Sequence, residues 1–464
     1  MNITPGRIGS DAPLRIAVIG SGISGLSAAW LLSKRHEVTL YEGDARLGGH
    51  SHTVEADGVP VDTGFIVYNE AAYPNLTALF AHLDVPTKMA DMSFAVSAEG
   101  GRLEYSGHGV RGLFAQKRNL ANPRFYAMLR DLLRFYREAP RDAATCAGLT
   151  LAQYLDAGRY GAAFRDDHLF PMAAAIWSTP SAHVGEYPAD AFIRFFTNHG
   201  LLQLRDRPLW RTVDGGSRAY VRRLLAATSA TLSTGDPVTF VQRLDGRVAV
   251  GTRGGEARWF DHVVLATHAD QALRLLDHPT ADETALLGAF AYTSNTAVLH
   301  GDAGLMPRRR SAWAGWNYLS EGRGADRRLC VTYWMNALQG LDAARPLFVT
   351  LNPARPVRPE KVLRTDTYEH PVFNLAALDA QRRLWSLQGN GGVWFCGAYF
   401  GAGFHEDGLQ AGLAVAEALG GVRRPWSVPG ESDRITIGIP VATPRDVATP
   451  RDVEAVAAAQ EAVV

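Results

Sequence analysis

The stretch Arg15–Leu32, RIAVIGSGISGLSAAWLL, decides the fold. A short apolar run comes first, a G-x-G-x-x-G turn follows, and an apolar segment with helical periodicity completes it. In such a turn Gly20 permits the tight bend, Gly22 lets a pyrophosphate approach the backbone, and Gly25 lets the helix pack on the strand. Ile23 and Ser24 open the helix, whose free N–H groups suit an anion. This context predicts a dinucleotide site rather than an ordinary glycine-rich turn.

A second β-rich run begins at Val38 and ends on an acid, Glu42. A carboxylate there can accept hydrogen bonds from ribose hydroxyls, and its charge disfavours a 2′-phosphate. Arg46 can reach a phosphate, while the pair Gly48–Gly49 and the stretch Asp62–Gly64 let the chain pass close to a second, longer half of a cofactor. The continuation favours FAD over NAD.

These motifs resemble those of the flavin-containing amine oxidase and phytoene desaturase clan. In that clan a late strand and a glycine turn complete the flavin site, and Trp394–Ala398 and Gly403–Gly412 match them here. The resemblance implies that the last helix directs its N-terminus at the flavin N1 and C2 carbonyl, where reduction places negative charge. It also implies that the backbone of Val238 meets the adenine. The positions added to the expected cofactor site are His50, Gly64, Phe65, Ile66, Val238, Gly397, Asp407, Gly408 and Leu409.

Two positions depart from the clan's pattern. Its usual Gly-Gly-Arg is Gly48-Gly49-His50 here, and its usual Gly-Glu after the late strand is Gly397-Ala398. The flavin-side lysine that is characteristic of amine oxidases has no evident counterpart among the four lysines. FAD remains the expected cofactor, but amine oxidation becomes the less favoured chemistry.

A closer resemblance covers Leu14–Leu419. Four stretches, Asp62–Asn69, Asn122–Pro140, Met172–Pro180 and Phe195–Leu204, resemble a family of predicted NAD/FAD-binding proteins. A related domain is fused to cyclopropane fatty acid synthases in plants. The resemblance implies unsaturated or methylated acyl chains of lipids, or another small hydrophobic substrate, and a cyclopropane synthase-like methyltransferase as a partner.

The candidates for proton transfer are His50, His405 and Glu406, the ionisable side chains nearest the cofactor motifs. Histidine titrates near neutrality and suits this role, although either ring can instead bind flavin or backbone. His199, after Asn198, is expected to cap its helix. Aromatic residues that can line an apolar chamber, or fill the core instead, are Trp177, Phe192, Phe195, Phe196, Trp313, Trp316, Tyr333 and Trp334.

Composition narrows the remaining classes. The formal net charge of zero gives no reason to expect nucleic acid, and three scattered cysteines suit neither a disulfide framework nor a thiolate metal site. His50 and His52 alone do not predict a metal. Without a signal-like or membrane-spanning apolar run, we expect a cytoplasmic protein. Peripheral contact with the inner membrane surface through Arg308–Arg310 is an alternative to a solvated loop.

The 464 residues suit two interleaved domains of an α/β protein. We expect a Rossmann-type FAD-binding domain of glutathione reductase-like topology from residues 1–88, 212–290 and 376–426. An α+β substrate domain is expected from 89–211 and 291–375. Because a Pro-interrupted repeat, VATPRD, occurs twice near the end, residues 427–464 are expected to form a flexible tail.

The leading hypothesis is an FAD-dependent oxidoreductase that moves a hydride from a substrate C–H bond to flavin N5, as a desaturase or oxidase of acyl chains. One alternative is an amine or porphyrinogen-type oxidase. Another is a non-catalytic flavin-binding protein that presents lipid to a separate enzyme.

Overall fold

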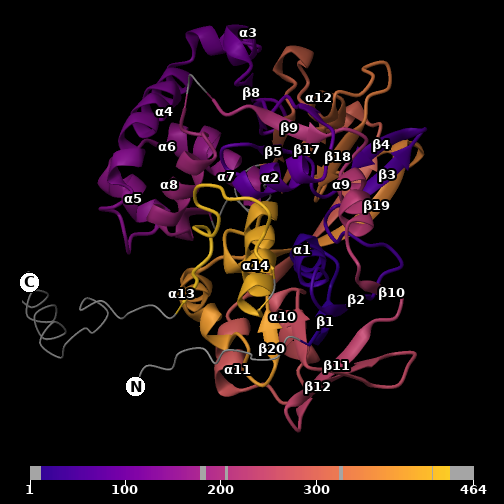
Figure 1. Ribbon diagram of the computed structural model, residues 1–464. Helices are drawn as coiled ribbons and strands as arrows, with labels where there is room; N and C mark the ends of the chain where they lie inside the picture. The colour runs from indigo at the N-terminus through magenta and orange to yellow at the C-terminus, as the bar shows by residue number, and fades with distance from the viewer. Residues whose placement is uncertain (1–11, 178–183, 204–206, 323–327, 421, 439–464) are drawn as a thin grey trace, which may run out of the picture.

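A parallel five-stranded sheet is the centre of one half of the protein. It is seen in a computed structural model that describes residues 12–177, 184–203, 207–322, 328–420 and 422–438 (Figure 1). All neighbouring strands run parallel, and β1 lies between β2 and β14. The strands in spatial order are β10 (Thr231–Thr234), β2 (Glu37–Glu42), β1 (Arg15–Ile19), β14 (His262–Leu265) and β20 (Val393–Phe395).

Helix α1 (Ile23–Leu32) follows β1 directly and is buried along its whole length. It packs against α14 (His405–Ala418) through small residues: a Cβ added at Gly412 would lie 2.2 Å from the Ser24 carbonyl oxygen. Ser24 Oγ also donates to the Gly408 carbonyl, at 2.8 Å. The strand, glycine turn, helix and strand read from the sequence are therefore confirmed, with a helix buried on both sides.

Further helices and a small sheet complete this half. The helices are α2 (Pro74–His82), α9 (Arg218–Ala226), α10 (Ala269–Leu275), α11 (Ala281–Leu287) and α13 (Leu375–Arg383). An antiparallel sheet of β11 (Val238–Leu244), β12 (Arg247–Thr252) and β13 (Arg258–Phe260) projects at the bottom of Figure 1.

A seven-stranded mixed sheet carries the other half. Its strands in spatial order are β19 (Val362–Val372), β15 (Ala291–His300), β18 (Phe348–Leu351), β17 (Arg328–Trp334), β16 (Trp316–Glu321), β7 (Phe94–Ala98) and β8 (Leu103–Ser106). Only the pairing of β16 with β7 is parallel. Strands β7 and β8 form a hairpin, whose turn places Glu99 at φ 49° and Gly100 at φ 63°.

A group of helices packs against β7 and β8 (Figure 1). The helices are α3 (Gly109–Leu113), α4 (Pro123–Asp142), α5 (Leu151–Ala157), α6 (Ala162–Phe164), α7 (Phe170–Trp177) and α8 (Ala189–Asn198). The inner face of α4 carries Phe125, Met128, Leu132 and Phe135, which are buried in one hydrophobic cluster with residues of α7 and α8.

Short elements connect the two halves. They are the hairpin of β3 (Thr53–Ala56) and β4 (Val59–Asp62), the sheet of β5 (Tyr68–Asn69), β9 (Trp210–Val213) and β6 (Thr87–Met89), and α12 (Met335–Gln339). The expected architecture, a Rossmann-type domain interleaved with an α+β domain, is confirmed. Among the described helices, none is long and apolar enough to cross a bilayer.

The expected flexible tail is wrong for its first part, residues 427–438. Arg434 Nε lies 2.6 Å from Asp407 Oδ1, and its Nη1 donates to the Ala72 carbonyl at 2.6 Å. Ile435 is buried against the main core. The ion pair of Arg434 with the buried Asp407 holds residues 427–438 against the folded core. Composition alone does not reveal such a contact. The remainder of the predicted tail, 439–464, lies outside the described residues.

Candidate cofactor and substrate cavity

The glycine turn has the backbone that the motif predicts. Gly20 has φ +101°, and a Cβ there would lie 2.8 Å from the Ala266 carbonyl oxygen. A Cβ at Gly25 would lie 1.9 Å from the Gly20 oxygen, so only glycine fits at this position in the first turn of α1. At Gly22, by contrast, a Cβ would meet no protein atom within 4 Å and would project toward a cavity. This open position leaves room for a ligand phosphate against the turn.

Glu42 ends β2 beside the turn and lines the same cavity. Its Oε2 accepts hydrogen bonds from Ser21 N at 2.9 Å and from Ser21 Oγ at 2.6 Å, while Oε1 accepts one from Asp44 N at 3.1 Å. These bonds fix the carboxylate at the carboxyl edge of the sheet. Val238 does not line the cavity, although Pro237, just before it, lies 3.2 Å from a Cβ built at Gly43, next to Glu42.

The pair Gly48–Gly49 brings a second loop onto the turn. Both have positive φ, and a Cβ at Gly49 would lie 2.9 Å from Gly22 Cα. Arg46 is used within this loop: its Nη2 donates to the Gly49 carbonyl at 2.8 Å and its Nη1 to the Ser51 carbonyl at 3.2 Å. In this structure the guanidinium of Arg46 closes the loop and does not line the cavity, and its contact with a phosphate stays a prediction.

One cavity of about 470 Å³ runs from this turn to the seven-stranded sheet. Its first part lies at the carboxyl ends of parallel strands, the place where open α/β sheets bind ligands. The predicted cofactor positions that line it are Gly20, Gly22, Ile23, Ser24, Glu42, Gly49, His50, Gly64, Phe65, Ile66 and Gly397. Gly25 and Gly48 lie outside the lining and shape the backbone.

The far part of the cavity is apolar. It is lined by Met92, Phe94, Met172, Ile176, Phe195, Leu201, Trp210, Trp316, Tyr333 and Leu351. Of the predicted aromatic chamber, Phe195, Trp316 and Tyr333 are in place, whereas Phe192 and Phe196 are fully buried in the core. Trp313 and Trp334 contact each other, with ring centroids 5.4 Å apart, and Trp177's side chain lies outside the described part.

Three histidines meet where the two parts of the cavity join. The His50 ring centroid lies 6.2 Å from that of His268, 5.6 Å from that of His370 and 5.2 Å from that of Tyr368. Burial, with a smaller contribution from the neighbouring imidazoles, lowers the pKa of His50 to about 3. Its ring is therefore neutral at neutral pH. Among the described residues, no hydrogen bond involves the His50 ring.

The neighbours of His50 are held in place by polar contacts. The Asn295 amide lies 2.9 Å from His370 Nδ1 and can donate to it, and the Tyr368 hydroxyl contacts Thr63 Oγ1 at 2.7 Å and His52 Nδ1 at 2.8 Å. His268 stacks on Tyr292, with centroids 4.4 Å apart. The His50 ring thus has no hydrogen-bond partner among the described residues, and fixed aromatic and imidazole rings surround it.

His405 also lines the cavity, but it is already engaged. Its ring stacks on Phe65 at 3.8 Å, and its Nε2 lies 3.0 Å from Ser51 Oγ and 2.9 Å from the Tyr220 hydroxyl. Burial lowers the pKa of His405 to about 3. These contacts make His405 a support for Phe65, whereas His50 remains the candidate for proton transfer.

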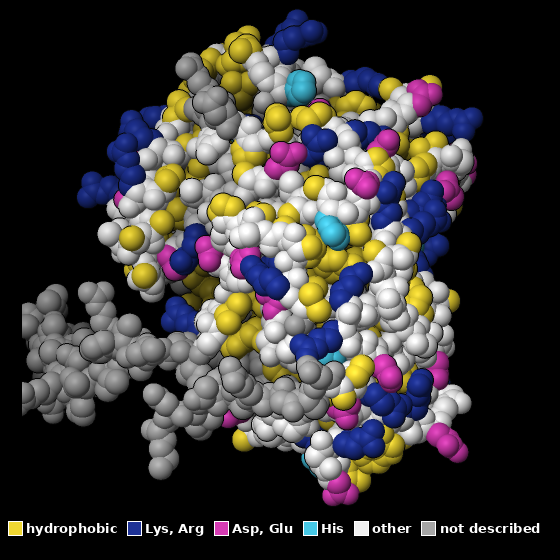
Figure 2. Space-filling view, in the orientation of Figure 1, with side chains coloured by type: hydrophobic (Ala, Val, Ile, Leu, Met, Phe, Trp, Pro, Cys, Tyr) yellow, Lys and Arg dark blue, Asp and Glu magenta, His cyan; other side chains and the backbone are white. Residues whose placement is uncertain are grey.

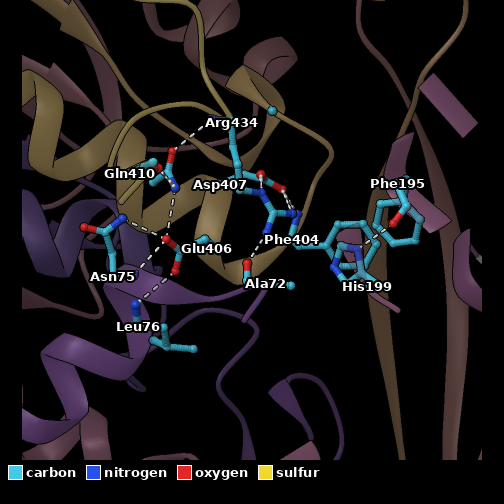
Figure 3. A network of polar contacts seen from close by, with 12 residues as sticks. Ala72, Asn75, Leu76, Phe195, His199, Phe404, Glu406, Asp407, Gln410 and Arg434 are labelled. Atoms are coloured by element: carbon cyan, nitrogen blue, oxygen red, sulfur yellow. Dashed lines mark hydrogen bonds and ion pairs between the residues drawn. The ribbon is translucent and has the colours of Figure 1, made fainter. Parts of the chain in front are cut away.

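Glu406 points away from the cavity, toward the N-terminus of α2 (Figure 3). Its carboxylate accepts from Asn75 N at 3.0 Å, Asn75 Nδ2 at 2.8 Å and Leu76 N at 2.9 Å, and Gln410 donates to it as well. Burial raises the pKa of Glu406. The prediction of a catalytic role for Glu406 is therefore wrong: the carboxylate caps a helix.

The three residues after Glu406 also lie outside the cavity lining. Asp407 accepts from Phe404 N at 2.7 Å and pairs with Arg434 (Figure 3). Gly408 packs on α1, and Leu409 is in the core. The residues just before Glu406 that do reach the cavity are Ala402, Gly403, Phe404 and His405. The resemblance located the right turn, but its cavity-facing residues lie a few positions earlier.

Sequence reasoning missed His268, Tyr368 and His370. His268 stands just past β14, and a polar residue at the carboxyl end of a parallel strand is a usable signal. Tyr368 and His370 lie on β19 of the other sheet, and no local pattern connects them to the glycine turn. His199 is the C-cap of α8, as expected, with Nδ1 2.9 Å from the Phe195 carbonyl, and it lines the cavity too.

Three features define a dinucleotide-binding protein of the flavoprotein type. They are the open space at Gly22, the carboxylate of Glu42 and the glycine pair Gly48–Gly49. A family model described as flavin containing amine oxidoreductase matches residues 23–301. The chain therefore belongs to this family of FAD-dependent oxidoreductases, and FAD is its cofactor. Among the described residues, no group of three His, Cys, Asp or Glu side chains could hold a metal ion.

Individual relatives match short stretches only. A putative flavin-containing monoamine oxidase, AofH, of Mycobacterium tuberculosis is 41% identical over 75 residues, 16% of either chain. A 4,4′-diapophytoene desaturase of Staphylococcus aureus is 42% identical over 52 residues, 11% of this chain and 10% of its own. The crystal structure of a CLA-producing fatty acid isomerase from P. acnes aligns with a TM-score of 0.62 at 16% identity, over 88% of this chain and 98% of that one. This last likeness shows the fold alone.

Proposed function

We propose that the protein oxidises a C–H bond in an apolar, acyl-chain-like substrate. The observation that carries the proposal is the single cavity that joins the glycine turn to an apolar chamber. When bound, FAD supplies a hydride acceptor at its flavin N5. A substrate that fills the chamber is held by burial of apolar surface, which contributes about 25 cal/mol per Å².

The chain's own residues divide the remaining work. The backbone of the glycine turn and Glu42 would hold the phosphates and ribose, and the Gly64–Ile66 loop with Gly397 would border the ring system. Phe195, Trp316 and the other chamber residues orient the chain and exclude water, which favours transfer between closely held groups.

His50 is the proposed proton acceptor. If a double bond forms, one hydrogen leaves the substrate as hydride, the neighbouring carbon loses a proton, and the electron pair of that second C–H bond becomes the π bond. No described residue occupies the nitrogen lone pair of the neutral His50 ring, although the burial that keeps the ring neutral also lowers its pKa and makes it a weak base. His268 and His370 border the same place and keep the ring in position.

One of the named relatives supports an apolar substrate. The desaturase of Staphylococcus aureus is named for 4,4′-diapophytoene. The cavity is also poor in charge: in the described part of the chain, Glu42 and Glu369 are the acids that line it, and no lysine or arginine does. A long uncharged chain fits this lining better than an ion.

Amine oxidation is the second candidate. Glu369 lines the cavity next to His268, with Oε2 3.5 Å from His268 Nδ1, and a carboxylate there could hold a substrate ammonium group. The match to the putative monoamine oxidase AofH supports this alternative. Its weakness is that Glu369 is partly exposed, with 46% of its side-chain surface accessible, so it holds a cation weakly.

An anaerobic absorbance titration of the FAD-loaded protein separates these functions. Unsaturated and methylated fatty acids, short amines and a porphyrinogen are added in turn, and the oxidised flavin band at about 450 nm is followed. We expect bleaching by the fatty acids only. Bleaching by an amine or the porphyrinogen alone would replace the proposal with the second hypothesis. A band that no substrate bleaches would favour a non-catalytic lipid-presenting protein.

A further inference from the structure

The sequence directs attention to Arg308–Arg310 as a membrane-contacting segment, but the structure commits these residues to the protein. Arg309 Nη1 lies 2.7 Å from Glu104 Oε2, the backbone N–H of Arg308 donates to the same carboxylate at 2.7 Å, and Arg310 lies over the Trp313 ring. Trp316, which follows this segment, lines the cavity. A surface contact through this segment is therefore not supported.

The outer face of α4 has the properties that Arg308–Arg310 lacks. Tyr126, Arg130, Leu133 and Arg137 follow one another at helical spacing on the side opposite the core. Tyr126 is 46% and Leu133 52% exposed, and the side chains of Arg130 and Arg137 are 75% and 66% exposed. The face is thus a row in which apolar and cationic side chains alternate.

The segment before α4 extends this row. The Tyr126 hydroxyl donates to the Leu120 carbonyl at 3.0 Å, which places exposed Leu120 beside the helix face. From 117 to 141 the sequence has seven basic and two acidic residues. Buried Asp131 pairs with Arg130, partly exposed Glu138 pairs with Arg137, and Asp166 and Asp167 pair with Arg124. The side chains of Arg130 and Arg137 nevertheless stay mostly exposed, so their charge faces solvent. Figure 2 shows basic side chains gathered along the edge of the molecule over α4.

We propose that the outer face of α4, with Leu120, is a docking surface for an anionic lipid bilayer. Arginine and lysine are attracted to anionic headgroups, tyrosine suits the headgroup zone, and leucine can enter the boundary of the acyl region. Exposed leucines among the arginines favour a bilayer over nucleic acid, which is bound through phosphates and does not reward apolar side chains. Charge complementarity and the alternating row carry the proposal.

The position of α4 connects this surface to the cavity. Its inner face packs in the same cluster as Ala173 and Ala174 of α7, and Met172 and Ile176 of that helix line the apolar chamber. The docking surface and the chamber thus belong to helices that share one hydrophobic cluster. A protein that rests on a bilayer through α4 would hold its chamber near a source of acyl chains. Bilayer binding itself needs neither FAD nor turnover, so it can fail or hold independently of the proposed reaction.

The test is co-sedimentation of the full chain with phosphatidylcholine vesicles, with and without phosphatidylglycerol. We expect binding only to the vesicles that contain phosphatidylglycerol. Raising the ionic strength from about 0.1 M to about 1 M, which shortens the Debye length from about 10 Å to about 3 Å, should release the protein. Equal binding to both vesicles, or none to either, would overturn the proposal; the latter result would leave an acidic protein as the partner.

Variants localise the contact. Arg130→Glu with Arg137→Glu should weaken binding at least about tenfold, and Leu133→Ser should weaken it less. The matched control is Arg222→Glu with Arg382→Glu, which reverses two exposed helical arginines of the other half. Loss of binding in the control to the same degree would contradict a role for α4. A Leu133→Trp variant reports directly on insertion of this face into the bilayer. Its tryptophan fluorescence should shift to the blue with phosphatidylglycerol vesicles, and an unshifted spectrum would contradict insertion.

Discussion

The two parts of the cavity differ in how the chain builds them. The cofactor part is mostly local: Gly20, Gly22 and Glu42 come from one strand–helix–strand unit, and spacing alone identifies them. The substrate part draws Met92, Phe195, Trp316 and His370 from four distant segments. The cofactor part therefore depends on backbone shape, and the substrate part on side chains. Substitutions should separate binding of FAD from binding and oxidation of the substrate.

The largest effect is expected from Gly25→Val. Any Cβ there would lie 1.9 Å from the Gly20 carbonyl oxygen, so the turn and α1 cannot keep their packing. Overpacking of this kind costs about 1–3 kcal/mol or more, and the cofactor turn is lost with it. We expect a lower free energy of unfolding in urea and little flavin in the purified protein. Normal stability with full flavin content would show that the turn is not constrained as described.

Gly22→Ala should separate cofactor binding from folding. Its Cβ meets no protein atom within 4 Å, so the free energy of unfolding without FAD should stay close to that of the natural protein. The same methyl group would occupy the space where a phosphate approaches, and the Kd for FAD should rise at least about tenfold. Fluorescence titration of the FAD-free protein measures this Kd. An unchanged Kd would place the phosphates elsewhere.

Met172→Asn should disturb the other part. An amide in the apolar chamber loses favourable contact with an acyl chain and must be desolvated, so KM for the fatty acid should rise about tenfold. FAD content should not change, because Met172 lies away from the glycine turn. The control is Leu209→Asn, at a position 65% exposed and outside the cavity lining. A loss of FAD from the Met172 variant would contradict the division of the cavity.

The last prediction concerns pH. Burial, then the nearby His268, lowers the pKa of His370 to about 4, whereas an unfolded histidine has a pKa of about 6.5. Between these values the unfolded chain binds a proton that the folded protein does not, so stability falls as pH falls. One such group contributes a slope of at most about 1.4 kcal/mol per pH unit.

His370→Gln should flatten that slope, measured by urea unfolding at pH 7 and pH 5. His278→Gln is the control, because the side chain of His278 is 90% exposed. An equal change in both variants would show that the burial of His370 is not the cause.

The sequence predicts well the features that depend on backbone shape. It predicts poorly which side chains meet in the cavity. The glycine turn, its acid and the glycine pair follow from local steric needs, so their spacing is readable. Glu406 shows the limit: its place next to the cofactor turn suggested catalysis, but α14 turns the carboxylate onto Asn75, far away in the chain. Likewise His370 reaches His50 only because β19 pairs with β15 in another sheet. Such neighbours are set by tertiary packing and have no local pattern.

The central claim, hydride removal from an acyl C–H bond, is tested most directly by an isotope effect on flavin reduction. Anaerobic stopped-flow mixing of the FAD-loaded protein with a fatty acid and with its perdeuterated form would follow the band at about 450 nm. The account predicts that the perdeuterated chain reduces the flavin several times more slowly, and that His50→Asn slows both while retaining FAD. Two results would contradict the proposed hydride removal. One is equal rates of flavin reduction by the two fatty acids when mixing and binding are shown to be fast, and the other is no reduction by either.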